Sequence, residues 1–262
     1  MRRMFNCLCI GLLVFVLASC QGITGRTDSQ AAVQAILEYG GFVQYDENGR
    51  VCQVSLVYTE DEWGNRIECN ETSDEILAQL PKLPDVRELL LRGSQATDRG
   101  MKHVGQLTKL ERLLMWDASQ LTDAGTAHLA NLRHLKDIHI SKSLISDGTL
   151  ETMSRLKELK SMSLTRNQFT DDGFKWLERM PQLTVLWVGS SVHRTTDAAI
   201  PHFLKLPNLE RLELQSSAIT DAGIMQLKEM KSLKHLFLWG SSATEEGARQ
   251  LQAAIPGLIV HF

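Results

Sequence analysis

Apolar residues recur along most of the chain as a triplet at the first, fourth and sixth positions of a short segment. In Leu209-Leu212-Leu214 the last two leucines flank a polar residue, which is typical of a short β-strand with one buried face. Regularly spaced strands whose apolar edges need a neighbour predict a solenoid. The triplet returns every 24 to 26 residues, at Val86-Leu89-Leu91, Leu110-Leu113-Met115, Leu135-Ile138-Ile140, Leu159-Met162-Leu164, Leu183-Leu186-Val188, Leu209-Leu212-Leu214 and Leu233-Leu236-Leu238, before a closing strand at Leu258 to Phe262.

A threonine or serine followed by aspartate marks the segment after most strands. In the unit that begins at Thr220, the apolar residues Ile224, Leu227 and Met230 lie three positions apart, which is helical spacing. Thr220 is placed to cap this helix, and Asp221 puts a negative charge in its positively polarised first turn. Each repeat is therefore expected to join one strand to one helix. The acidic residues of the seven units are Asp98, Asp123, Asp147, Asp171, Asp197, Asp221 and Glu245.

The strand triplet, written LxxLxL and followed by a polar residue, resembles the signature of the leucine-rich-repeat family. The resemblance covers residues 86–262 and implies an α/β fold, a curved solenoid with a parallel β-sheet on the concave side and helices on the convex side. The recurrent Thr-Asp-x-Gly resembles the cysteine-containing repeat subclass of F-box adaptor proteins and bacterial surface proteins. The adaptor function is not expected, because the chain carries no F-box motif.

Residues 31–85 are predicted to cap the N-terminal end of the solenoid. Residues 31–38 favour a helix that Gly40-Gly41 ends. Residues 42–45 and 51–57 alternate between apolar and polar side chains on either side of a turn sequence, which predicts a β-hairpin. A helix and a hairpin of this kind can cover the apolar edge of the first repeat.

The second hairpin strand also carries the repeat pattern, since Val51-Val54-Leu56 fits the triplet and supplies a first rung. This rung starts 35 residues before Val86, and the excess over one repeat lies in an insertion at residues 58–72. Insertions in a solenoid project from one face and often carry binding. An acidic hairpin could equally be a passive edge cover, so both interpretations stay open.

The first residues have the layout of an export signal. Arg2 and Arg3 precede an uncharged run at residues 7–19, which is too short to span a bilayer as a helix. The run ends in Leu17-Ala18-Ser19-Cys20, which resembles the lipobox of bacterial lipoproteins. The resemblance implies that residues 1–19 are removed, that Cys20 carries the lipid, and that residues 20–30 form a polar tether. The expected location is the cell envelope, on the periplasmic or outer-membrane side.

Removal of the signal would leave Cys52 and Cys69 as the unmodified thiols. In an exported, oxidising setting a Cys52–Cys69 disulfide is the first expectation. Free thiols remain the alternative, because spacing does not establish whether the two α-carbons approach within bonding range. Zinc is not expected, since two cysteines without histidines at ligand spacing make a poor site.

Charge and motifs argue against several functions. The formal net charge of −3 and the isoelectric point near 6.2 provide no basic excess to attract nucleic acid. No nucleophile elbow, phosphate-binding loop or dinucleotide fingerprint occurs in a strand-turn-helix context. We therefore expect a monomer that is not an enzyme and that binds no metal or cofactor.

The strand positions that lie between and just beyond the triplet leucines are expected to point away from the core, onto the concave face. Large aromatic side chains beside arginine are typical of protein-binding hot spots, so a protein partner is expected. Carbohydrate binding by stacking on Trp187 is the alternative, as is a purely structural envelope role, and Trp116 and Trp239 could instead pack beneath loops. The candidate residues are Arg92, Arg112, Leu114, Trp116, His139, Trp187, Arg211, Glu213, His235, Phe237 and Trp239.

Overall fold

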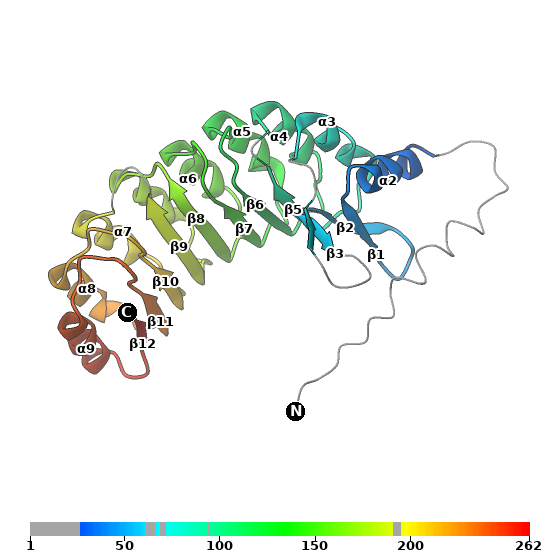
Figure 1. Cartoon of the computed structure of the whole chain (residues 1–262). Coiled ribbons are helices and arrows are strands. Elements are labelled where there is room, and N and C mark those ends of the chain that lie inside the picture. The colour runs from blue at the N-terminus through cyan, green and yellow to red at the C-terminus, as the bar shows by residue number, and fades with distance from the viewer. Residues whose placement is uncertain (1–26, 61–65, 69–71, 94, 191–194) are drawn as a thin grey trace.

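A computed structural model of the chain describes residues 27–60, 66–68, 72–93, 95–190 and 195–262. Strands of the described residues form a ten-stranded sheet in the order β1-β2-β5-β6-β7-β8-β9-β10-β11-β12, on the inner side of an arc whose outer side is covered by helices (Figure 1). The predicted α/β leucine-rich-repeat solenoid is confirmed. The strands are β1 (Phe42–Tyr45), β2 (Val51–Leu56), β5 (Glu88–Arg92), β6 (Arg112–Trp116), β7 (Asp137–Ile140), β8 (Ser161–Asn167), β9 (Val185–Ser190), β10 (Arg211–Glu213), β11 (His235–Phe237) and β12 (Ile259–His261).

The strands stack in register, so that equivalent residues of successive repeats lie side by side. Leu212 pairs with Leu186 on one side and with Leu236 on the other, and all three are fully buried. From β2 to β12 every pair is parallel, whereas β1 runs antiparallel to β2. The triplet residues therefore form a continuous core between the sheet and the helices, and their burial is the main stabilising contribution of each repeat.

The helices of the convex side are short, because each repeat leaves room for only one or two turns before the chain returns to the sheet. Several of them are 3₁₀ turns, alone or after an α-helical turn. The α-helices are α2 (Asp28–Glu38), α3 (Asp74–Leu77), α4 (Asp98–Val104), α5 (Asp123–Ala127), α6 (Asp147–Met153), α7 (Ile200–Phe203), α8 (Asp221–Gln226) and α9 (Glu245–Ala254), and the 3₁₀ helices are η1 (Leu80–Lys82), η2 (His128–Asn131), η3 (Asp172–Arg179), η4 (Asp197–Ala199) and η5 (Leu227–Glu229).

The repeated aspartates connect neighbouring repeats. Asp147 accepts hydrogen bonds from the backbone N–H (2.9 Å) and the hydroxyl (2.6 Å) of Thr170, one repeat further on. Helix-start electrostatics alone, which the sequence suggested, therefore gives an incomplete account of this position. The same double contact joins Asp74 to Thr97, Asp98 to Thr122, Asp123 to Ser146, Asp171 to Thr196, Asp197 to Thr220 and Asp221 to Thr244.

Two consequences correct the sequence interpretation. Thr220 stands at the start of its helix, but its hydroxyl donates to Asp197 and makes no cap hydrogen bond. The series also begins one unit earlier than the pattern suggested, at Ser73-Asp74. At the other end of the series Glu245 stands in place of aspartate, and its side chain makes no contact of this kind within the described residues.

The glycine of the Thr-Asp-x-Gly motif makes room for the aspartate of the preceding repeat. A Cβ added at Gly173 would overlap the Asp147 carboxylate, and one at Gly223 would overlap that of Asp197. The motif therefore encodes a contact between repeats, in which aspartate reaches forward and glycine gives it space.

Two repeats lack glycine at this position. Ala199 replaces it in the repeat after Asp171, which keeps both hydrogen bonds from Thr196. The other repeat, which follows Asp123, adds hydrogen bonds to the contact. Its glycine, Gly148, is shifted by one position, and Thr149 lies beside Asp123. The backbone N–H and hydroxyl of Thr149 donate to that carboxylate at 3.0 and 2.6 Å, in addition to both donors of Ser146. Burial raises the pKa of Asp123, but the hydrogen bonds from Ser146 and Thr149 outweigh it, and the pKa lies below the ordinary value.

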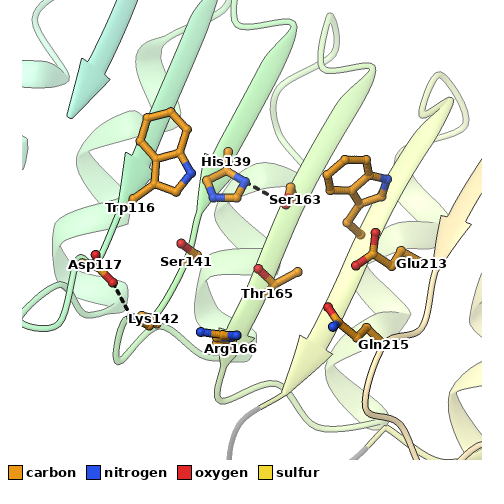
Figure 2. Close-up of a pocket in the computed structure, with 11 residues that line it drawn as sticks. Trp116, Asp117, His139, Ser141, Lys142, Ser163, Thr165, Arg166, Glu213 and Gln215 are labelled. Atoms are coloured by element: carbon orange, nitrogen blue, oxygen red, sulfur yellow. Dashed lines mark hydrogen bonds and ion pairs between the residues drawn. The ribbon is translucent and has the colours of Figure 1, made fainter. Parts of the chain in front are cut away.

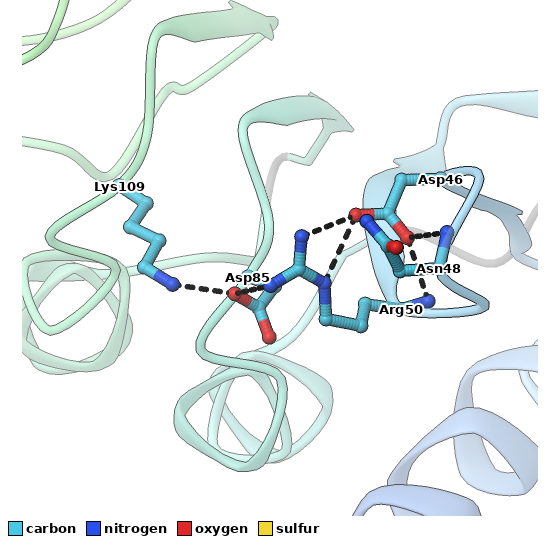
Figure 3. Close-up of polar contacts among 5 residues, drawn as sticks. All are labelled: Asp46, Asn48, Arg50, Asp85 and Lys109. Atoms are coloured by element: carbon cyan, nitrogen blue, oxygen red, sulfur yellow. Dashed lines mark hydrogen bonds and ion pairs between the residues drawn. The ribbon is translucent and has the colours of Figure 1, made fainter.

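The N-terminal cap has the predicted helix and hairpin, and polar contacts join the hairpin to the repeats. In the hairpin turn Asp46 accepts hydrogen bonds from the backbone N–H groups of Asn48 and Arg50, both 2.9 Å. The Arg50 guanidinium lies 2.8 Å from Asp46 and 3.7 Å from Asp85, which in turn pairs with Lys109 at 2.5 Å (Figure 3). These contacts fix the cap against the loops of the first two repeats.

The insertion contains a separate antiparallel pair, β3 (Tyr58–Glu60) and β4 (Arg66–Glu68). Cys52 is half-buried in β2, whereas its expected disulfide partner Cys69 lies outside the described residues. The export signal and Cys20 also lie outside them. Within the described part of the chain, every helix is too short or too polar to cross a bilayer.

Candidate functional site on the concave face

The side chains between the core leucines form rows across the concave face, because the parallel strands are in register. All of the predicted concave residues lie on this face. One row, at the first positions of the strands, contains Arg112, Arg211 and His235. At or just beyond the C-terminal ends of the strands stand Arg92, Trp116 and Trp239. The middle row runs through Leu90, Leu114, His139, Ser163, Trp187, Glu213, Phe237 and His261.

Aromatic rings gather at the C-terminal end of the middle row. The rings of Phe237 and His261 stack with centroids 4.1 Å apart and planes 7° from parallel. Trp239, which is 44% exposed, tilts against Phe237 at 5.2 Å. The alternative in which Trp239 packs beneath a loop is therefore wrong, since nearly half of its surface is open to solvent.

A hollow of about 340 Å³ opens on the concave face between β6 and β10 (Figure 2). Ser163 lies at its floor, because this small residue stands in the middle row between the larger His139 and Trp187. Trp116 lines the hollow on the β6 side, and Trp187 lines it on the β9 side. The ring centroids of Trp116 and His139 are 5.4 Å apart. The hollow is lined by Trp116, Asp117, His139, Ser141, Lys142, Ser163, Thr165, Arg166, Trp187, Glu213 and Gln215.

Glu213 is an acidic residue in an unusual setting. It was predicted as a surface residue, but its exposed fraction is only 8%. Trp187 and Phe237 flank it in the middle row. Its carboxyl group lines the hollow, and no hydrogen bond or ion pair joins that group to the described residues. Burial raises its pKa. A carboxyl group that is largely withdrawn from water and has no protein partner lowers the stability of a fold, so Glu213 is a candidate for contact with a ligand in the hollow.

His139 and Ser163 form a hydrogen bond in the floor of the hollow, with 2.9 Å between Nδ1 and Oγ. The pair does not make a hydrolytic site. The other ring nitrogen, Nε2, has no partner among the described residues, so no carboxylate orients the ring. Burial lowers the pKa of His139 and favours its neutral form, although Asp137 opposes this. The geometry gives no reason to assign a reaction to these two residues.

The rim of the hollow is built from residues that the sequence interpretation missed. Asp117 and Lys142 follow β6 and β7, and Arg166 lies near the end of β8, where the register shifts between Thr165 and Asn167. Each of the three has a positive φ of 53° to 59°. Lys142 pairs with Asp117 at 2.7 Å, and this hydrogen bond lowers the pKa of Asp117. The three residues are one repeat apart in sequence, so their spacing was the available signal, but no apolar pattern marked them.

The described residues contain no group of three histidine, cysteine, aspartate or glutamate side chains arranged to hold a metal ion. The hydroxyl, amide and carboxyl groups of the hollow provide hydrogen-bond partners, and its two indoles provide apolar faces. These are the components of a binding surface for a polar ligand.

The fold and its concave hollow define a leucine-rich-repeat solenoid, and solved structures share that fold. An internalin (inlF) from Listeria monocytogenes matches with a TM-score of 0.57 and 20% sequence identity, over 70% of this chain and 49% of that one. This chain thus spans about half of that internalin. Internalin C2 (inlC2) from the same organism matches with a TM-score of 0.57 and 18% identity, over 92% of this chain and 99% of that one. No protein-family model and no curated protein matches the sequence.

Proposed function

We propose that the chain is a non-catalytic binding module of the bacterial cell envelope, which presents its concave face to a protein partner. The observation that carries the proposal is the hollow, where Trp116 and Trp187 flank a polar floor and Glu213 is buried without a partner. Exposed aromatic side chains next to arginines are the usual anchors of protein interfaces. The internalin likeness supports the scaffold and leaves the partner to the concave side chains.

The test of binding compares variants of concave aromatic residues in capture experiments. Trp187→Ala and Phe237→Ala should each weaken the capture of a partner from envelope proteins at least about tenfold, since both remove a central aromatic anchor. Trp176→Ala is the matched control, because Trp176 lies on the convex side, where Arg179 packs on its ring at 4.7 Å. Equal capture by all variants would contradict the proposal. Capture of purified cell-wall glycan in place of protein, lost on Trp187→Ala, would favour carbohydrate binding instead.

Anchoring of the module rests on the lipobox, and we propose that Cys20 carries the lipid. Acyl chains bury apolar area in the bilayer and would hold the protein there durably. Wild-type protein made in a bacterial host should enter the detergent phase on phase separation, whereas Cys20→Ser should move almost entirely to the aqueous phase. Cys52→Ser is the matched control and should leave the partition unchanged. A Cys20→Ser protein that stays in the detergent phase would exclude lipidation at this residue.

A further inference from the structure

The concave hollow contains one group whose chemistry specifies a ligand. Glu213 is 8% exposed and has no hydrogen-bond or ion-pair partner among the described residues. By contrast, Asp117 and Asp137 on the same face are paired, with Asp117 2.7 Å from Lys142 and Asp137 3.1 Å from Arg112. Burying a carboxyl group without a partner is costly, so the complement of Glu213 is expected to come from outside the chain.

The surroundings of Glu213 favour a cation. In the sheet register Trp187 lies on one side of Glu213 and Phe237 on the other, on adjacent strands roughly 4.8 Å away. The faces of aromatic rings attract positive charge, most strongly those of tryptophan. A carboxyl group between aromatic side chains therefore complements a flat, positively charged group better than it complements a neutral one.

The guanidinium group of arginine fits this setting and the remaining polar lining. It is planar, so it can stack on an indole, and two of its five N–H donors can pair with a carboxylate side by side. Ser163 and Thr165 line the same hollow and have hydroxyl oxygens that can accept further N–H donors. We propose that the hollow receives an arginine side chain of the protein partner, whose guanidinium pairs with Glu213 and stacks on Trp187. This inference rests on the proposed function.

The positive charges at the rim do not outweigh this attraction. Lys142 is paired with Asp117, and Arg166 is exposed at the strand-end side of the hollow. Charges in contact with solvent interact weakly because water and salt screen them. Glu213 lies in the less polar interior of the face, where the same Coulomb attraction is several times stronger. The attraction between Glu213 and a bound guanidinium is therefore stronger than the repulsion of that guanidinium by Lys142 and Arg166.

The test uses small probes with the full mature chain and its variants. N-acetyl-arginine methylamide is titrated while the indole N–H resonance of Trp187 is followed by NMR, with Trp187→Phe to assign that resonance. The wild-type protein should bind with a dissociation constant on the order of millimolar. The citrulline analogue, which has the same shape without the charge, should bind at least about tenfold more weakly, because a charge-assisted pair is lost. Equal binding of the two probes would overturn the proposal.

Glu213→Gln supplies the second arm of the experiment. It should weaken arginine binding at least about tenfold, whereas Glu210→Gln, an acid of the same strand region that pairs with Lys234 outside the hollow, should leave binding unchanged. Glu213→Gln should unfold at the same or a higher urea concentration than wild type, because it removes an unpaired buried charge. A marked loss of stability would assign Glu213 a structural role and overturn the proposal.

The outcomes separate this inference from the function on which it rests. If Trp187→Ala abolishes partner capture while Glu213→Gln does not affect it, the concave face binds a protein and the arginine pocket is wrong. If no concave variant affects capture, the proposed function itself fails. A methyl glycoside of N-acetylglucosamine is titrated in the same way. If it shifts the Trp187 resonance in a saturable manner and the arginine probe does not, the hollow binds a sugar and the proposal is overturned.

Discussion

Replacing Asp123 with alanine is expected to lower the free energy of unfolding by about 3 kcal/mol, the sum of several lost charge-assisted hydrogen bonds less relaxation. The carboxylate accepts hydrogen bonds from both the backbone N–H and the hydroxyl of Ser146 and of Thr149. Without it these donors stay partly buried and unpaired between two repeats. Urea unfolding followed by circular dichroism at neutral pH measures the change.

The pH dependence of this loss has a definite sign. The pKa of Asp123 in the folded protein lies below the ordinary value of 3.8, so its contribution is fully present above pH 3.8 and is lost as the pH falls through the lowered pKa. The difference in the free energy of unfolding between Asp123→Ala and wild type should therefore become smaller below pH 3.8.

Glu245→Ala is the matched control for the aspartate contact. Glu245 occupies the same position of its unit, but within the described residues it makes no contact with a threonine of another repeat, so its removal should cost no more than about 0.5 kcal/mol of helix-start electrostatics. Equal losses of unfolding free energy in Asp123→Ala and Glu245→Ala would contradict the contact between repeats. They would show that helix-start electrostatics alone accounts for the recurrence of the acidic residue in each repeat.

The repeat architecture followed directly from the sequence because its physical cause is periodic. The leucine triplets each bury the same face, and one repeat such as Leu209-Leu212-Leu214 suffices to place the others. The hairpin of the cap was equally accessible, because Gly49, with φ at 72°, occupies the turn between β1 and β2. Local signals of this kind do not depend on how the repeats pack.

The role of the Thr-Asp-x-Gly motif was harder to predict. Within a single repeat, threonine and aspartate are adequately explained as a helix start, and that explanation misses the neighbour one repeat away. Gly173 and Asp147 belong to different repeats, yet they meet across the stack. Contacts between repeats can be recognised only when the helix starts are superimposed as well as the strands.

The sequence predicted which residues lie on the concave face, but it did not predict which of them are buried or paired. Alternation placed Trp187 and Glu213 on that face, yet it could not show that Glu213, beside Trp187 in the sheet register, is only 8% exposed. Nor could it identify Asp117, Lys142 and Arg166, which adopt positive φ just after β6 and β7 and near the end of β8. Burial of a polar side chain among larger ones is a property of packing, so the unpaired acid became visible only in three dimensions.

Replacing Gly173 with alanine is expected to destabilise the solenoid by about 2 to 3 kcal/mol, the range for overpacking a closed contact. The added Cβ would overlap the carboxylate of Asp147, which is held in place by the backbone N–H and hydroxyl of Thr170. Alanine otherwise favours a helix over glycine by up to about 1 kcal/mol. A loss of stability would therefore come from the overlap, against the intrinsic preference of the chain.

A double-mutant cycle with Asp147→Ala isolates this overlap. Truncating Asp147 removes the carboxylate that the new methyl group meets, so Gly173→Ala should cost much less in that background, and the two changes should couple by about 1 to 2 kcal/mol. Urea unfolding of the four proteins at neutral pH provides the measurement. If the two losses of unfolding free energy are additive, Gly173 is needed for the conformation of its own backbone and not to make room for the aspartate of the preceding repeat. Coupling would establish that the two residues act as one unit, which recurs as Asp74 with Gly100, Asp98 with Gly125, Asp197 with Gly223 and Asp221 with Gly247.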